Sequence, residues 1–345
     1  MKFKILISLV SVITLVSIIF EAGYFSKAED NQSSESKTED NQSSESTVDC
    51  SPDCTNESNG RSSSISIQII SPTPGYLLPT NNRPNFSWQP EPGAGNYFVA
   101  ITDFSETIWE LETGDTQIIY PADKPPLKPD KDYTLTVETL IGDRAKSGEL
   151  NFRLLGEEEA EKVEVAATEI RNQNNLTAEE RVVKIAEIYE NKRLYSAAIA
   201  LLNNTIAEGK VSPEIYQTLG NVYREAGLSF LAESPYQTAI ELATNLEDKN
   251  AIAEAQIGLA RVNISQNKLD EAISLLEKAR ANYREINNRE LAAQLAQFLG
   301  EVWDEKGDTS QAIKWYQQAA EEYENLGDLE RLNYVKEILE RLNKR

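Results

Sequence analysis

The chain divides into two stretches in which apolar residues are spaced differently, and each spacing predicts a different kind of structure. From Ile65 to Leu155, short runs of alternating apolar and polar residues are separated by turn residues, a pattern typical of antiparallel strands. From about residue 157 onward, apolar residues recur at helical spacing. We therefore expect an all-β domain followed by an all-α domain.

Strands are expected in the first stretch near 65–70, 84–89, 96–103, 107–112, 116–120, 132–140 and 148–155. Proline, glycine and aspartate punctuate the intervals, as in Pro72-Thr73-Pro74-Gly75 and Thr113-Gly114-Asp115. Short strands at this regular spacing predict an antiparallel sandwich.

The helical stretch repeats with a period of 40 residues from residue 213 to the end. Each repeat has a leucine, a small residue directly after it, and an aromatic or polar residue three positions further on. These are Leu219, Leu259 and Leu299; Gly220, Ala260 and Gly300; Tyr223, Asn263 and Trp303. An alanine, a bulky residue and a second alanine follow: Ala232, Ala272 and Ala312; Tyr236, Leu276 and Tyr316; Ala239, Ala279 and Ala319. An earlier unit fits at a spacing of 34, with Ala186, Tyr189, Ala198 and Leu202. A fixed period of this length predicts a solenoid of helical hairpins, in which small residues let paired helices approach closely.

Local signals mark where these helices begin and turn. Thr177 with Glu180 forms a capping box, and Ser212 before Pro213 is an N-cap with proline at the first helical position. Tight turns are expected near three residues that tolerate the left-handed conformation, namely Gly227, Asn267 and Gly307. Pro235 is expected to kink or delay its helix. A connecting helix is expected over 157–172 and a terminal capping helix over 329–342.

The order of residue types in the repeat resembles the tetratricopeptide repeat, a helix–turn–helix unit that stacks into a superhelix. The earlier stretch resembles a fibronectin type III or immunoglobulin-like domain, in which a tryptophan on an early strand and a tyrosine on a late strand are core residues. Trp88 and Tyr133 match those positions. The resemblances imply an immunoglobulin-like β-sandwich over 65–156, a connecting helix over 157–176, four hairpins over 177–327 and a cap over 328–345.

The N-terminal residues indicate export. Lys2 and Lys4 precede an uncharged apolar run, Ile5–Phe20, which is the plan of a secretory signal. Cleavage after Ala28 and retention as an uncleaved membrane anchor are both open, and either outcome places the rest of the chain outside the cytoplasm. Residues 29–64 are rich in serine, glutamate and asparagine and are expected to form a disordered tether.

Both cysteines of the chain, Cys50 and Cys54, lie in this tether. In an exported protein we expect a local disulfide between them. Intermolecular pairing, free thiols and a metal site are the alternatives. Two thiols in a chain without histidine make a poor set of metal ligands.

Composition narrows the function classes. Thirty-four basic and 56 acidic residues give a net charge of −22, and no basic cluster is present that could bind nucleic acid or anionic lipid. The absence of histidine excludes Ser-His-Asp and Cys-His arrangements. Without a phosphate loop, a nucleophile elbow or a metal motif, we expect no enzymatic activity and no cofactor.

The repeat family implies a groove lined by exposed positions of the first helix of each hairpin. In this chain these positions include Glu180, Glu187, Glu190, Glu214, Gln217, Asn221, Arg224, Arg261, Gln294, Gln297, Glu301, Asp304 and Glu305. Because acidic residues surround Arg224 and Arg261, we expect the groove to prefer a basic or neutral protein or peptide over an acidic one. The alternative is that these residues form only solvated helix faces.

The sequence thus predicts an extracytoplasmic, non-enzymatic scaffold for protein–protein interaction at a bacterial cell envelope, with a membrane tether through residues 5–20 if the signal is retained. A second hypothesis is that the β-sandwich binds a glycan or cell-wall polymer through a surface aromatic residue such as Trp109, and that the repeats act as a spacer.

Overall fold

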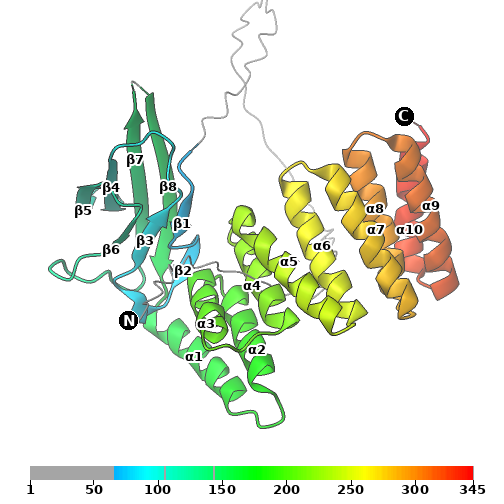
Figure 1. Ribbon diagram of the computed structural model, residues 1–345, viewed down its shortest axis with the longest axis horizontal. Helices are drawn as coiled ribbons and strands as arrows, with labels where there is room; N and C mark the ends of the chain where they lie inside the picture. The colour runs from blue at the N-terminus through cyan, green and yellow to red at the C-terminus, as the bar shows by residue number, and fades with distance from the viewer. Residues whose placement is uncertain (1–65, 105, 143, 345) are drawn as a thin grey trace, which may run out of the picture. The chain divides into compact units, whose positions relative to one another are not determined.

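The computed structural model describes residues 66–104, 106–142 and 144–344. The described residues form eight strands, a short 3-10 helix over Pro79–Asn81 and ten α-helices, with every strand preceding every α-helix in the chain (Figure 1). The predicted signal segment, the tether, Cys50 and Cys54 lie outside the described residues.

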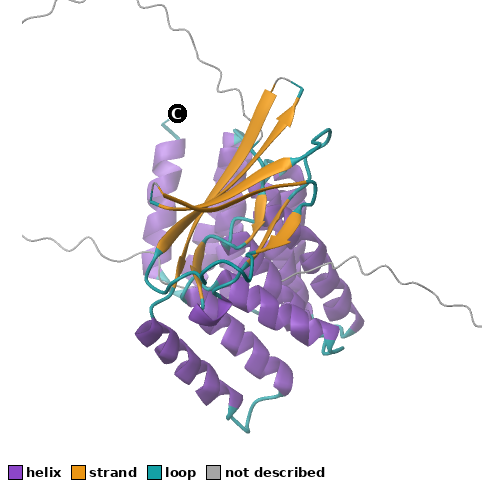
Figure 2. Ribbon diagram, turned by 90° about the vertical axis from the view of Figure 1, so that its left-hand side faces the viewer, coloured by secondary structure: helices purple, strands orange, loops and turns teal. Residues whose placement is uncertain are grey.

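The strands form two sheets (Figure 2). The smaller sheet has the order β1 (Ile69–Ser71), β3 (Asn85–Trp88) and β6 (Gln117–Ile119), and its strands are antiparallel. The larger sheet has the order β2 (Gly75–Leu77), β8 (Arg144–Leu154), β7 (Asp132–Ile141), β4 (Tyr97–Asp103) and β5 (Glu106–Thr113). Within it, β2 runs parallel to β8 and the other neighbours are antiparallel.

Both sheets contribute to one hydrophobic core. Phe86 and Trp88 of β3 cluster with Val99 and Ile101 of β4 and Leu135 of β7, and all five are buried. This follows from the alternation along each strand, since residues two apart share a face. The sequence-based strand positions agree closely with the structure, except that β2 falls where only a turn was predicted. A three-residue strand that contains Gly75 has no alternation by which it could be recognised.

Trp109 corrects the glycan hypothesis. Its side chain is 6% exposed, and its ring stacks on Phe86 at 5.9 Å and meets Tyr120 edge-on at 5.8 Å. Trp109 pairs with Ile101 across β4 and β5, and Ile101 faces the core. Trp109 is therefore not the surface aromatic residue that the glycan hypothesis requires.

The helices follow as one connecting helix, four hairpins and a last helix (Figure 1). Their bounds are α1 (Glu157–Arg171), α2 (Ala178–Asn191), α3 (Tyr195–Ala207), α4 (Pro213–Glu225), α5 (Ser229–Asn245), α6 (Lys249–Ser265), α7 (Leu269–Glu285), α8 (Arg289–Glu305), α9 (Thr309–Leu326) and α10 (Leu329–Leu342). Helices α2, α3 and α4 have 13 or 14 residues, whereas α5 to α9 have 17 or 18. The longer helices explain why the repeat lengthens from 34 to 40 residues.

The predicted local signals are present in the structure. The capping box of Thr177 is complete, and the Ser212 hydroxyl accepts a hydrogen bond from the backbone of Ile215. Gly227, Asn267 and Gly307 have φ of 76°, 59° and 87°, as their turn positions require. Pro235 does not delay the start of its helix. Helix α5 begins at Ser229, and Pro235 lies inside it. An unpredicted set of left-handed residues separates the longer hairpins from the helices that follow them: Glu247, Asn287 and Gly327.

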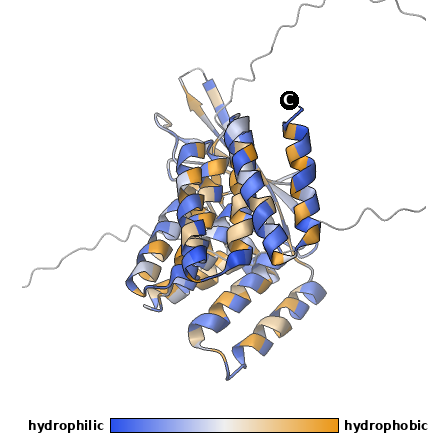
Figure 3. Cartoon of the chain, turned by 90° about the vertical axis from the view of Figure 1, so that its right-hand side faces the viewer, coloured by the Kyte–Doolittle hydropathy of each residue, from blue (hydrophilic) through white to orange (hydrophobic). Residues whose placement is uncertain are grey.

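Small residues set the spacing between helices. Each helix carries hydrophobic and hydrophilic residues at intervals along its length (Figure 3), and the alanines that the repeat places in register, such as Ala232, Ala272 and Ala312, are buried. One close approach is at Gly258 of α6, where an added Cβ would lie 1.9 Å from the Tyr236 ring of α5. Within the described ranges, no helix is long and apolar enough to span a bilayer.

Candidate functional site

The predicted groove residues lie on the first helices of the hairpins, α2, α4, α6 and α8. We call the surface that these helices share the A-helix face. Helix α4 contacts both α2 and α6. Asn221, Arg261 and Glu301 occupy equivalent positions 40 residues apart, one on each of α4, α6 and α8. The repeat therefore aligns an amide, a guanidinium and a carboxylate in one row across three helices.

At the centre of this face, Asn221 joins two helices through its side chain. The Tyr236 hydroxyl of α5 donates a hydrogen bond to Asn221 Oδ1 at 2.6 Å, and Arg224 Nη2 donates to the same oxygen at 3.3 Å. Burial raises the pKa of Tyr236 to about 12, and the charges of Arg224 and Arg261 oppose that rise. Tyr236 therefore stays protonated and donates its hydrogen bond to Asn221. Through Asn221, this contact also helps to hold Arg224 in place.

Arg261 presents its side chain to solvent and lies over the ring of Phe298, with its Cζ atom 5.5 Å from the ring centroid. Burial and the nearby charge of Arg224 lower the pKa of Arg261. The guanidinium remains charged at neutral pH. No ion pair of Arg261 is found among the described residues.

Three carboxylates on the same face have raised pKa values. Burial raises the pKa of Glu187 on α2, of Glu254 on α6 and of Glu301 on α8. Glu254 accepts hydrogen bonds from Gln217 and Asn250, each at 2.9 Å, and Glu301 accepts one from Gln297 at 3.0 Å. The hydrogen bonds lower the pKa of both groups without cancelling the effect of burial. A cation placed on this face would therefore meet carboxylates that have lost part of their water.

Several predicted groove residues serve the fold instead. The carboxylate of Glu180 accepts the backbone N–H of Thr177 at 2.7 Å and completes the capping box, which lowers its pKa. Gln217 and Asn221 are 4% and 2% exposed, so they are buried polar residues and not lining residues. The other members are exposed or partly exposed: Glu187, Glu190, Glu214, Arg224, Arg261, Gln294, Gln297, Glu301, Asp304 and Glu305.

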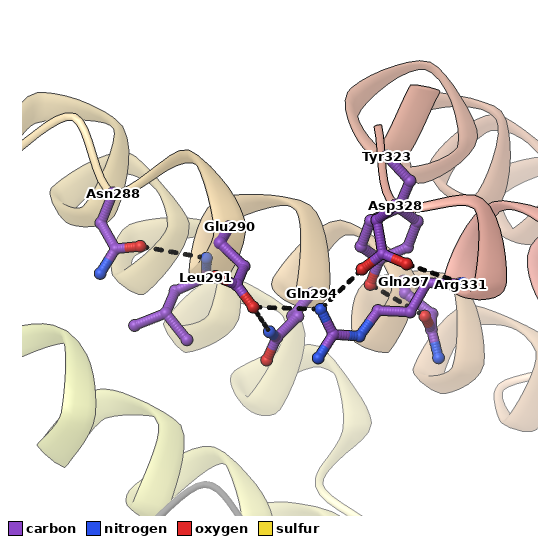
Figure 4. Close-up of polar contacts among 8 residues, drawn as sticks. All are labelled: Asn288, Glu290, Leu291, Gln294, Gln297, Tyr323, Asp328 and Arg331. Atoms are coloured by element: carbon purple, nitrogen blue, oxygen red, sulfur yellow. Dashed lines mark hydrogen bonds and ion pairs between the residues drawn. The ribbon is translucent and has the colours of Figure 1, made fainter. Parts of the chain in front are cut away.

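The end of the face near α8 is tied to the last helix (Figure 4). Arg331 of α10 bridges Glu290 of α8 at 3.1 Å and Asp328 at 2.9 Å. Gln294 donates to the same Glu290 carboxylate at 3.3 Å, and Gln297 accepts from the Tyr323 hydroxyl at 3.0 Å. These contacts fix Gln294 and Gln297 at the α8 end of the face.

Three contributors were not predicted. Glu254 lies 40 residues after Glu214 and 40 before Gln294, so the repeat register could have identified it. Phe298 and Tyr236 act by packing and hydrogen bonding from beneath the face, and no sequence signal separates that role from core packing. Within the part of the chain that the structure describes, no group of three or more His, Cys, Asp or Glu residues could hold a metal ion.

Comparisons with known proteins concern the helical part of the chain. The family model of the tetratricopeptide repeat matches residues 212–285. Tetratricopeptide repeat protein 29 of Macaca fascicularis is 28% identical over 160 residues, covering 42% of this chain and 33% of the relative. The Homo sapiens protein of the same name is 26% identical over 144 residues, covering 39% and 29%. The chain thus spans about a third of the length of the curated relatives it matches.

Solved structures are also similar to this chain. One is the MamA protein, at 22% identity and a TM-score of 0.39, covering 50% of this chain and 89% of that one. Another is YrrB, described as a TPR protein with an unusual peptide-binding site, at 18% identity and a TM-score of 0.36, covering 48% and 80%. The repeat match and the run of helical hairpins together identify the C-terminal part of the chain as a tetratricopeptide-repeat solenoid.

Proposed function

We propose that this protein is a non-enzymatic scaffold that binds a protein or peptide partner on its A-helix face. A tetratricopeptide-repeat solenoid offers extended rows of side chains and no enclosed catalytic pocket, and such arrays bind proteins or peptides. The observation that carries the proposal is that the carboxylates Glu187, Glu254 and Glu301, each exposed or partly exposed, lie on the first helices α2, α6 and α8 of three hairpins.

The charges on this face favour a basic or neutral partner. A partly desolvated carboxylate gains more from a lysine or arginine than a fully hydrated one does, because less water has to be removed when the pair forms. Arg224 and Arg261 lie between the carboxylates and would bind polar or acidic residues within an otherwise basic segment. A uniformly acidic tail would meet Glu190 and Glu301 on either side of the arginines, since both act on this charge cluster.

We further propose that the β domain is immunoglobulin-like and that the protein works outside the cytoplasm at a bacterial cell envelope. The two sheets share one core, Trp88 is buried on an early strand, and Tyr133 is buried at the start of β7. The Tyr133 hydroxyl accepts the backbone N–H of Lys128 at 2.9 Å, a corner arrangement typical of such domains. The proposed location rests on the basic and apolar N-terminal segment alone.

Fluorescence anisotropy with helical peptides of matched length and basic, neutral or acidic charge would test the partner preference. We expect the intact protein to bind the basic peptide most tightly, and the Glu187→Lys/Glu301→Lys variant to lose that preference. The matched control is Glu241→Lys/Glu321→Lys, which makes the same change of net charge on exposed positions of the second helices α5 and α9. Equal loss in both variants would contradict the A-helix face, since only net charge would then matter.

A further inference from the structure

The rest of the described chain covers one edge of the larger sheet and leaves the other edge uncovered. At the β2 edge, the backbone N–H of Tyr76 donates to the Arg193 carbonyl at 3.0 Å, and the backbone there is so close that a Cβ on Gly75 would lie 2.5 Å from the same oxygen. The segment between α2 and α3 therefore covers that edge. The opposite edge is β5, whose strand partner in the described chain is β4 alone (Figure 1).

Strand β5 is long and regular enough to accept another strand. It has eight residues, and from Trp109 to Thr113 it pairs with β4 in unbroken register, the irregularity lying before Trp109. Apart from the ladder with β4, the backbone of Glu106–Glu112 makes no backbone hydrogen bond to any other described residue. The outward N–H and C=O groups of this strand thus form a free hydrogen-bonding edge, the feature through which a sheet gains an extra strand.

The side chains of β5 specify what kind of strand would fit. Glu110 and Glu112 point to the outer face, where they lie opposite Ala100 and Phe98 of β4. Neither carboxylate forms an ion pair with any described residue. Leu111 points to the core side opposite Val99, and it is still 38% exposed because no strand lies beyond it. Along this edge, acidic positions on one face therefore alternate with an uncovered apolar position on the other.

The outer face next to this edge has the same character. Phe98 is 42% exposed and lies between Glu112 of β5 and Glu138 of β7, each of them its direct cross-strand partner. A lysine or arginine on an added strand would be placed beside Glu112 and within reach of the Phe98 ring, where cations are attracted by both the carboxylate and the aromatic face.

We propose that β5 is a second binding edge, which takes up an extended segment of a partner protein that alternates basic and apolar residues. The basic residues would lie opposite Glu110 and Glu112, and the apolar residue between them would cover Leu111. A second copy of this chain does not fit, because pairing β5 with β5 would place Glu110 and Glu112 opposite glutamates of the other copy. This proposal does not depend on the A-helix face.

The test uses the intact protein and a peptide of about ten residues that alternates lysine and valine, the length of one ordinary strand or slightly more. Amide hydrogen exchange, measured with and without the peptide, should show new protection in β5. Binding should weaken by about tenfold or more in the Glu110→Lys/Glu112→Lys variant, since two attractive cross-strand pairs become repulsive ones. A peptide that alternates glutamate and valine should bind the Glu110→Lys/Glu112→Lys variant more tightly than it binds the intact protein.

The matched control is Glu241→Lys/Glu321→Lys, which makes the same charge change on exposed positions of α5 and α9, away from the edge. We expect a smaller loss of binding in this control than in the edge variant. Protection that appears in α4, α6 or α8 and not in β5, or equal losses in the two variants, would overturn the proposed edge. The Glu187→Lys/Glu301→Lys variant separates the two surfaces, because its loss of the helical peptide should leave the strand peptide bound.

Discussion

Substitution of Gly258 by alanine provides the sharpest test of how the solenoid packs. The added Cβ would lie 1.9 Å from Cε1 and 2.3 Å from Cζ of Tyr236, whereas ordinary contacts begin at 3.4 Å. The ring is fully buried and its hydroxyl is held by Asn221 at 2.6 Å, so it cannot swing into solvent. Helices α5 and α6 would have to separate, or the ring would have to leave its position.

The expected cost follows from three contributions. Overpacking of a close-packed core costs about 1–3 kcal/mol, and a displaced ring that breaks the buried hydrogen bond from the Tyr236 hydroxyl to Asn221 costs a further ~1–3 kcal/mol. Alanine in place of glycine in a helix returns about 1 kcal/mol. We therefore expect Gly258→Ala to lower the free energy of unfolding by about 3 kcal/mol, measured by urea denaturation followed by far-UV circular dichroism.

Two further variants make this reasoning refutable. Gly300→Ala should cost less, because the ring atoms of Tyr316 lie 3.0 Å from its added Cβ and need to move only slightly. Tyr236→Leu should relieve Gly258→Ala in the double variant, since Leu276 occupies the equivalent position of the next repeat. A Gly258→Ala protein that is as stable as the parent, or more stable, would show that the two helices are not packed as described.

The remaining predictions concern charges, hydrogen bonds and a helix cap. Burial raises the pKa of Glu187, so the folded state binds the proton of this carboxyl more tightly than the unfolded state does. The stabilisation that this proton gives is present at low pH and is lost as pH rises through the folded-state pKa. Glu187→Gln should therefore raise the melting temperature at pH 7 and leave it unchanged below about pH 4. Arg280 is buried, donates to the Ala292 carbonyl at 3.1 Å and pairs with Glu322 at 2.5 Å, so Arg280→Ala should cost about 3–5 kcal/mol in chemical denaturation, whereas Arg280→Met/Glu322→Leu should recover most of it. Tyr236→Phe should cost about 1–2 kcal/mol by the same assay, because Asn221 loses its buried donor. Ser212→Ala removes the side-chain cap of α4 and should cost about 1 kcal/mol, whereas Ser212→Asp should restore it.

Much of the solenoid could be predicted because its signals are local. The capping box at Thr177, the left-handed turn at Asn267 and the last helix, Leu329–Leu342, depend on residues within a few positions of one another. Contacts between elements were harder to predict. The repeat register pointed to Ala260 as a site of close approach, yet it gave no sign of Gly258, where the ring of Tyr236 from the preceding hairpin leaves no room for a Cβ.

The candidate site shows the same limit. Exposed polar positions of the first helices were identified correctly for Arg261 and Glu301, but Gln217 and Asn221 are buried by neighbours whose distance no sequence pattern reveals. The burial of Trp109 likewise depends on Phe86 and Tyr120, which reach it from the other sheet and from the segment after β6. Periodicity determines which face a residue occupies, whereas burial depends on what packs against that face.

The central claim is that the A-helix face is the surface on which a partner binds. The most direct measurement is capture of envelope proteins by the intact chain, by Glu301→Lys/Asp304→Lys and by the control Glu241→Lys/Glu321→Lys, with circular dichroism to show that all three are folded. We predict a partner that the intact chain and the control retain and the A-helix variant loses. Retention of the same partner by all three proteins would contradict the claim.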